Sequence, residues 1–208
     1  FKISRENLGE FYKTLAAKMP LFLPIRKAGE VNFGYYEEGA EVDIDTLKSV
    51  KSPKGVFFPQ SENMMRFRTE GKKLEIEDVR SERDPFAVFG VRACDYKAFS
   101  VLDNVFLQEP VDTYYKEKRE AAIIFTLACG KPQQSCFCSV FGIDASQPMG
   151  DVTCWLDEKA LYLRANTEKG EKALSLVANL TEKCDDKHVE ELKGEIKKKL
   201  EKLPYKDL

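Results

Sequence analysis

The chain has 208 residues, enough for one large domain or two small ones with a hydrophobic core. Apolar residues make up 43% and charged residues 33% of the sequence, which is ordinary for a folded protein. The formal net charge is −2 and no segment is strongly basic, so nucleic acid is a poor candidate partner. No run approaches the roughly 18 apolar residues of a membrane helix, and no signal peptide is visible, so we expect a cytoplasmic protein.

The first part of the chain is predicted to be one helix followed by a β-rich region. Ser4 can cap a helix over residues 4–18, in which apolar residues recur on one face. Pro20 is expected to end that helix. The segments expected after it are strands at 21–23, 31–36 and 55–59, a short helix at 45–50, and a hairpin formed by 64–68 and 74–77.

The middle of the chain is predicted to form a βαβ unit. Residues 86–91 form a continuous apolar run typical of a buried parallel strand, and residues 121–127 form another. Between them lie two helix-like segments at 95–106 and 112–120, the second capped by Asp112. The apolar face expected for the first of these helices consists of Ala98, Val101, Leu102 and Val105. A strand, a helical crossover and a second strand indicate parallel pairing with a right-handed connection.

The last part is predicted to be a hairpin followed by two helices. Residues 152–156 and 160–164 flank a short turn. Thr167 can cap a helix that runs to about residue 183. Asp185 or Asp186 can cap a final helix, whose apolar stripe consists of Val189, Leu192, Ile196, Leu200 and Leu203.

Four of the six cysteines gather in the middle of the chain. Cys94 follows the first buried strand, Cys129 follows the second, and Cys136 and Cys138 come soon after in one loop. Because the carboxyl ends of neighbouring parallel strands meet at one edge of a sheet, about 4.8 Å apart, we expect Cys94 and Cys129 to converge. In a chain without a visible leader, free thiols or metal ligands are favoured over disulfides.

Several interpretations of these cysteines stay open from the residues alone. Four thiolates suit an iron–sulfur cluster or a structural zinc site, and buried thiols also occur as small hydrophobic residues. Cys94, at the start of a helix, is a candidate reactive thiol, although the adjacent Asp95 opposes its activation. Arg92 is expected to bond to the site or to an acidic partner, or else to form a buried ion pair.

His188, the one histidine, lies in a charged helix start and is predicted to be a solvated surface residue. With a single histidine, a histidine-based zinc enzyme or a Ser-His-Asp triad is nearly excluded.

The central motifs resemble a known family. They occur in the same order in the beta subunit of cytoplasmic sulfhydrogenases and in the corresponding subunit of anaerobic sulfite reductase, and the resemblance covers roughly residues 52–176. The motifs are FGVRACD at 89–95, LDNVF at 102–106, YYKEKRE at 114–120, LAC at 127–129 and CFC at 136–138.

This resemblance implies an iron–sulfur electron-transfer subunit. Such a subunit works between a flavin-containing partner and a hydrogenase, a sulfite reductase or a similar catalytic subunit. The cysteines that fall in the family's motifs, and that it implies as ligands of a [4Fe–4S] cluster, are Cys94, Cys129, Cys136 and Cys138. Cys154 and Cys184 fall outside the motifs. Family members usually continue into a ferredoxin-like region with two cluster-binding cysteine runs, which these 208 residues lack.

The sequence therefore predicts an α/β protein with α+β character: a β-rich N-terminal half, a small parallel βαβ sheet with the cysteine site, and C-terminal helices. We expect one compact unit over residues 1–208, divisible into a β-rich part at 1–84 and a cysteine-bearing α/β part at 85–208. The predicted function is electron transfer, as a non-catalytic subunit or domain of an anaerobic oxidoreductase complex. The alternative is a docking domain for a partner redox subunit, without redox chemistry and with structural or zinc-bound cysteines.

Overall fold

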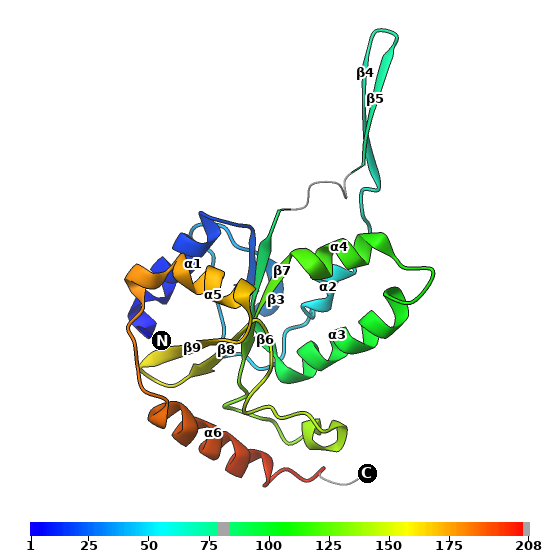
Figure 1. The fold of residues 1–208 in the computed structure, drawn as a ribbon. Helices are drawn as coiled ribbons and strands as arrows, with labels where there is room; N and C mark the ends of the chain where they lie inside the picture. The colour runs from blue at the N-terminus through cyan, green and yellow to red at the C-terminus, as the bar shows by residue number, and fades with distance from the viewer. Residues whose placement is uncertain (79–83, 206–208) are drawn as a thin grey trace.

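A seven-stranded sheet forms the centre of the computed structural model, which describes residues 1–78 and 84–205 (Figure 1). The strand order is β1-β9-β8-β7-β6-β2-β3. The four neighbouring strands β8, β7, β6 and β2 pair in parallel, and the outer strands β1, β9 and β3 pair antiparallel. The strands are β1 Lys2–Ser4, β2 Leu21–Lys27, β3 Glu30–Tyr35, β6 Phe86–Arg92, β7 Ala122–Leu127, β8 Val152–Leu156 and β9 Ala160–Ala165.

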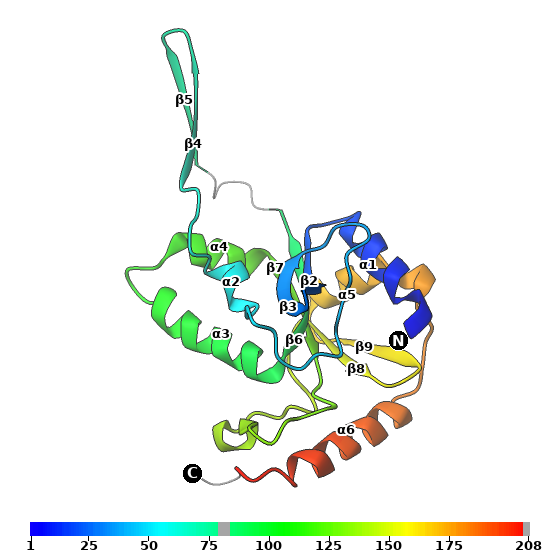
Figure 2. The ribbon, with the colours of Figure 1, turned by 180° about the vertical axis from the view of Figure 1, so that it is seen from behind.

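Helices cover both faces of this sheet (Figure 1, Figure 2). α1 and α5 lie on one face, and α2, α3 and α4 lie on the other. The helices are α1 Leu8–Ala16, α2 Lys54–Phe57, α3 Ala93–Phe106, α4 Thr113–Ala121, α5 Glu168–Ser175 and α6 Lys187–Leu200, with 3-10 turns η1 Arg5–Asn7, η2 Cys138–Phe141 and η3 Ala178–Leu180. The predicted α/β class, with a β-rich N-terminal half and C-terminal helices, is confirmed.

Each face of the sheet has its own hydrophobic core. On the side of α1 and α5, Phe11, Phe89 and Phe125 are fully buried. On the side of α3 and α4, the core is built around Phe57 and Phe99, whose ring centroids lie 4.7 Å apart. The two cores cover β6 and β7 from both sides, which explains why these two strands are apolar apart from Arg92 and Thr126.

The last helix closes the end of the sheet at which β6 and β7 finish (Figure 1). α6 places Val189 and Ile196 against Trp155 and Tyr162 of the β8–β9 hairpin. The predicted apolar stripe is thereby confirmed as a packing face from Val189 to Leu200, whereas Leu203 lies beyond the end of the helix. No helix among residues 1–78 and 84–205 is long and apolar enough to cross a membrane.

The hairpin of β4 (Met65–Glu70) and β5 (Lys73–Asp78) projects away from the sheet (Figure 2). Its strands pair as predicted, with Phe67 opposite Ile76. Both of these side chains are exposed, and the hairpin belongs to no core cluster among the described residues. The hairpin lies at the end of the sheet opposite α6 (Figure 1).

The predicted βαβ unit is confirmed, because β6, α3, α4 and β7 follow one another and β6 pairs with β7 in parallel. The predicted apolar face of α3 is wrong in part: Val101 and Val105 are exposed, whereas Leu102 packs against the core. The helix instead packs through an aromatic stripe that includes Tyr96, Phe99 and Phe106. Aromatic rings bury more apolar area than aliphatic side chains, so the face of α3 that carries the rings packs against the sheet.

Three further predictions on local structure are wrong. Residues 55–59 are not a strand, because α2 starts after Pro53 and buries Phe57 under α3. Residues 45–50 are not a helix, because the Asp43 carboxylate accepts hydrogen bonds from the amides of Asp45 and Thr46. The helix that begins after Thr167 ends at Ser175 instead of near residue 183.

Candidate functional site

The cysteines follow the carboxyl ends of β6 and β7, which lie side by side with Arg92 opposite Leu127. Cys94 is in the first turn of α3, and Cys129 comes two residues after β7. The amide of Cys129 donates to the carbonyl of Ala145 at 2.9 Å, which fixes the start of the following loop. The parallel sheet thus brings these two thiols to one edge, as the sequence predicts.

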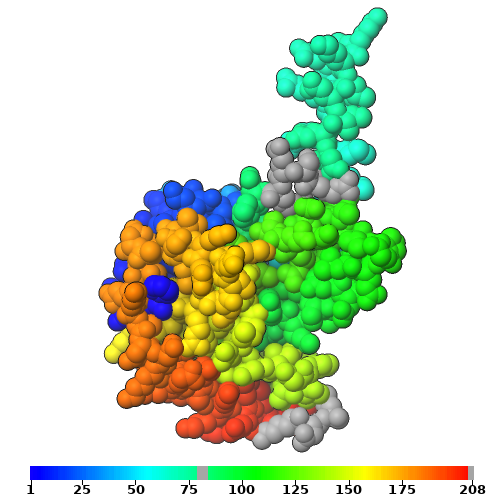
Figure 3. Space-filling view, viewed as in Figure 1, coloured from blue at the N-terminus to red at the C-terminus, as the bar shows by residue number. Residues whose placement is uncertain are grey.

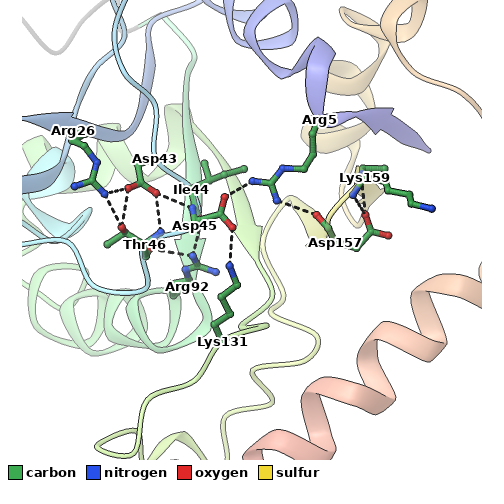
Figure 4. A network of polar contacts seen from close by, with 11 residues as sticks. Arg5, Arg26, Asp43, Ile44, Asp45, Thr46, Arg92, Lys131, Asp157 and Lys159 are labelled. Carbon is green, nitrogen blue, oxygen red and sulfur yellow. Dashed lines mark hydrogen bonds and ion pairs between the residues drawn. The ribbon is translucent and has the colours of Figure 1, made fainter.

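A bulge at Gly90 determines which way the end of β6 faces. Gly90 has φ +86°, and the register of the β6–β7 pair shifts between Phe89 and Val91. After this shift Val91 joins the core under α3. Arg92 then turns to the opposite side, where it meets the segment 43–46 (Figure 4).

A short loop brings the other two cysteines to the same edge. The amide of Cys136 donates to the carbonyl of Gln133 at 2.9 Å, which closes a tight turn. Cys138 begins the 3-10 turn η2, which ends at Gly142 in the left-handed conformation. The amide of Ile143 returns to the carbonyl of Cys138 at 3.1 Å, so the loop folds back on itself.

All four predicted site cysteines line one cavity of about 270 Å³. Other side chains of its wall include Leu47, Lys48, Arg92, Ala93, Asp95 and Ala145. Cys94 is exposed and Cys136 and Cys138 are half-buried, so the cavity lies near the molecular surface. The remaining two cysteines are elsewhere: Cys154 is buried within β8, and Cys184 packs beside α6.

The four thiols interact with one another. The thiol of Cys138 hydrogen-bonds to Cys94 and lowers the pKa of Cys94 to about 7, which favours its thiolate. The same hydrogen bond, together with burial, raises the pKa of Cys138. Burial raises the pKa of Cys129. Cys136 accepts a hydrogen bond from the amide of Gln133 at 3.4 Å, so main-chain donors also point at the sulfurs.

Arg92 places a largely buried positive charge beside these thiols. Its guanidinium donates to the carbonyl oxygens of Ala128, Ile44 and Thr46, at 3.2, 2.7 and 3.2 Å (Figure 4). Neither an ion pair nor a direct bond to a thiol is found for it among the described residues. Burial lowers its pKa, while the electrostatic interactions with Cys129 and Cys94 act in the opposite direction. The expected buried ion pair is not found among the described residues, because the observed bonds go to neutral carbonyls; the expected bond to a cluster sulfide or to an acidic partner stays a prediction.

The segment 43–46 accepts two of the hydrogen bonds of Arg92 and so holds this residue beside the cavity, which sequence reasoning missed (Figure 4). Asp43 pairs with Arg26 and accepts from the hydroxyl of Thr46 at 2.8 Å. Asp45 pairs with Arg5 and with Lys131, the latter at 3.3 Å. The signal in the sequence is the Asp-x-Asp-Thr pattern at Asp43, which is typical of a side-chain-capped turn. The prediction of a helix over residues 45–50 excluded this turn.

His188 is at the surface, as predicted, but it has partners. Its Nε2 lies 2.8 Å from Oδ2 of Asp157, and its ring contacts Tyr162. The hydrogen bond to Asp157 raises the pKa of His188. This contact ties the start of α6 to the turn between β8 and β9.

The donor arrangement differs from that of a single-ion site. No group of three His, Cys, Asp or Glu side chains among residues 1–78 and 84–205 is close enough to hold one metal ion. The cavity is far larger than the roughly 30 Å³ that one water occupies in the liquid. Four sulfur donors around a largely apolar cavity, with a cation beside them, could hold a metal group that carries negative charge.

The fold and the cavity define a three-layer α/β protein with a thiol-lined site at the carboxyl edge of its parallel strands. The chain is similar to sulfhydrogenase 2 subunit beta of Pyrococcus furiosus, with 28% identity over 151 residues. The alignment covers 73% of this chain and 43% of that protein, so the chain spans less than half of the relative's length. The predicted resemblance to the beta subunit family is confirmed for this partial region. No family model and no solved structure matches the chain.

Proposed function

We propose that this chain is an iron–sulfur electron-transfer subunit, or a domain of one, in an anaerobic oxidoreductase complex. Cys94, Cys129, Cys136 and Cys138 are the proposed ligands of a [4Fe–4S] cluster, which supplies one-electron transfer when bound. The similarity to a sulfhydrogenase beta subunit supports this kind of complex. The proposed partners are flavin-containing and catalytic redox subunits, and the proposed compartment is the cytoplasm.

The convergence of four thiols on one cavity is the observation that carries this proposal. They come from three separate places in the chain, the start of α3, the end of β7 and the loop after it. Thiols buried only as hydrophobic residues have no reason to share a cavity near the surface, whereas ligands of one group do. Cys154, which is enclosed in the core, illustrates the hydrophobic case.

The charges around the cavity support a negatively charged occupant. A buried guanidinium bonded only to neutral oxygens loses hydration without gaining an ion pair, which is unfavourable. Thiolates next to Arg92 would provide the missing negative charge. Hydrogen bonds from main-chain amides such as that of Gln133 also stabilise charge on sulfur.

The alternative is a docking domain whose cysteines are structural or hold zinc. Zinc requires four ligands at about 2.3 Å from a single centre when they are thiolates. The spread of donors around this cavity favours a polynuclear cluster over that arrangement.

Metal and sulfide analysis tests the proposal. The chain is purified or reconstituted without oxygen, and iron, acid-labile sulfide and zinc are measured per chain together with the visible spectrum. We expect about four iron and four sulfide, and a broad absorption near ~400 nm that dithionite bleaches. Cys136→Ser should lose the cluster. Cys184→Ser, which changes a partly buried thiol outside the cavity, is the matched control and should keep it.

Two results contradict the proposal. Stoichiometric zinc without sulfide identifies a structural metal site and supports the docking domain. If a folded chain contains neither metal nor sulfide after anaerobic reconstitution, the result supports a docking domain that binds no metal.

A further inference from the structure

The loop of residues 130–143 presents aromatic side chains to the solvent. Phe137, between two of the site cysteines, is 48% exposed, and Phe141 is 60% exposed. Their ring centroids lie 5.8 Å apart, so they form one apolar patch. An exposed aromatic pair on a loop that is otherwise polar typically marks an interaction surface.

Two lysines beside this loop, Lys48 and Lys199, donate hydrogen bonds to neutral acceptors, so no carboxylate neutralises their charges there. Lys48 Nζ donates to Oγ of Ser135 at 3.0 Å, and Lys199 Nζ donates to the carbonyl of Gly130 at 2.9 Å. Both acceptors are neutral, and neither lysine has an ion pair among the described residues. The single charged residue within 130–143 is also a lysine, Lys131, which in contrast to the other two pairs with Asp45.

Two carboxylates next to the loop are already paired with other lysines. Asp95 forms an ion pair with Lys54 at 3.0 Å. Asp144, directly after the loop, lies 3.8 Å from Lys197. Neither Asp95 nor Asp144 therefore neutralises the positive charge of Lys48 or Lys199. The loop combines an apolar centre with a cationic border.

We propose that this loop is the docking face for a small acidic iron–sulfur carrier protein, an inference that rests on the proposed function. Phe137 and Phe141 contact an apolar spot on the carrier, and Lys48, Lys131 and Lys199 face its carboxylates. An apolar centre with a charged rim is the usual arrangement of transient protein interfaces. One electron leaves the carrier and one is gained at the cysteine site, and no bond is made or broken.

Electrostatics makes this partner the best match. Complementary charge accelerates encounter and excludes wrongly charged partners, whereas the small area of the aromatic pair limits affinity. The position of Phe137 between Cys136 and Cys138 brings the carrier within one residue of two proposed ligands. An acidic surface at this place also satisfies cations that otherwise contact only solvent and neutral oxygens.

Binding and cross-linking to a purified acidic ferredoxin test the inference. The full chain is first reconstituted, and its iron and sulfide content is confirmed. The dissociation constant is then measured at 20 and 200 mM NaCl, and contacts are mapped by carbodiimide cross-linking and mass spectrometry. We expect cross-links at Lys48, Lys131 or Lys199, and affinity at least about tenfold weaker at the higher salt concentration.

A charge-reversed chain provides the decisive comparison. Lys48→Glu with Lys199→Glu, compared with the unmodified chain at equal iron content, should weaken ferredoxin binding at low salt by about tenfold or more. Lys72→Glu with Lys73→Glu makes the same charge change at the exposed tip of the β4–β5 hairpin and should leave binding unchanged.

Several outcomes overturn the inference. These are no binding by the iron-loaded chain, cross-links confined to other lysines, and equal effects of the two double variants. If Lys48→Glu with Lys199→Glu fails to fold, the salt dependence and cross-links of the unmodified chain still decide. Failure to incorporate iron and sulfide contradicts the proposed function itself, so the two failures are distinguishable.

Discussion

Arg92 links the fold to the chemistry of the site at the scale of a single residue. Its position follows from the bulge at Gly90, and three carbonyl oxygens hold its guanidinium against the segment 43–46. These bonds fix the side chain without neutralising it. The positive charge therefore remains available to the thiols, and it interacts electrostatically with Cys129 and Cys94.

Removing this charge should lower the reduction potential of the proposed cluster. Reduction adds a negative charge, which a nearby cation stabilises. We expect Arg92→Met to shift the midpoint potential downward by on the order of 50 mV. Arg92→Lys keeps the charge and should shift it less. The measurement is a redox titration followed by visible absorption or electron paramagnetic resonance. Equal potentials in all three proteins would show that Arg92 acts only by holding the segment 43–46.

The sequence predicted that the thiols converge, but it did not predict the contacts around them, and the difference has a physical reason. The positions of Cys94 and Cys129 follow from local strand and helix patterns, and parallel pairing then brings them together. Arg92 takes its partners from 36 to 48 residues away, and no local pattern encodes such bonds. The turn at 43–46, which holds Arg92, was missed because helix propensity was weighed without the turn-forming Asp43.

At the scale of elements, the prediction was reliable where burial leaves a clear apolar pattern in the sequence. β6 and β7 are apolar except for Arg92 and Thr126 because both of their faces are covered, so their sequences predict buried strands. α2 was misassigned because a four-residue helix has too few positions to show a period. Its structure depends on burying Phe57 under α3, which is a tertiary effect.

The attachment of α6 should depend on pH. The hydrogen bond to Asp157 raises the pKa of His188 above its usual value of about 6.5. The charged pair therefore adds stability that is fully present below that value and is lost as the pH rises through the raised pKa. His188 also lowers the pKa of Asp157, so the contribution declines again when acid protonates this carboxylate.

Replacing His188 by Gln tests this contact. We expect a loss of at most about 1 kcal/mol in the free energy of unfolding near pH 5.5, because the pair is half-exposed and screened by solvent. The difference from the unmodified chain should vanish near pH 9. Urea unfolding followed by the fluorescence of Trp155, which is buried under α6, measures it. A difference that is the same at both pH values would assign the effect to the ring contact with Tyr162.

At the scale of the whole molecule, the cysteine cavity and the β4–β5 hairpin lie at opposite ends of the sheet (Figure 1). The space-filling view shows the hairpin standing clear of the body (Figure 3). A two-stranded hairpin is only marginally stable by itself, and this one exposes Phe67 and Ile76. The sequence predicted its strands but not its isolation, because an alternating pattern does not reveal what covers its apolar face.

The fold of the body should not require the hairpin. Replacing Met65–Asp78 by a short Gly-Ser linker removes side chains that belong to no core cluster of the described residues. We expect the thermal midpoint of the body to change by no more than about 3 °C, because little buried apolar area is lost. Deleting residues 187–208 is the contrasting change. It uncovers Trp155 and Tyr162, and it should lower the midpoint markedly and shift the tryptophan emission to longer wavelength. A large loss of stability in the hairpin variant would show instead that the hairpin is part of the folding unit.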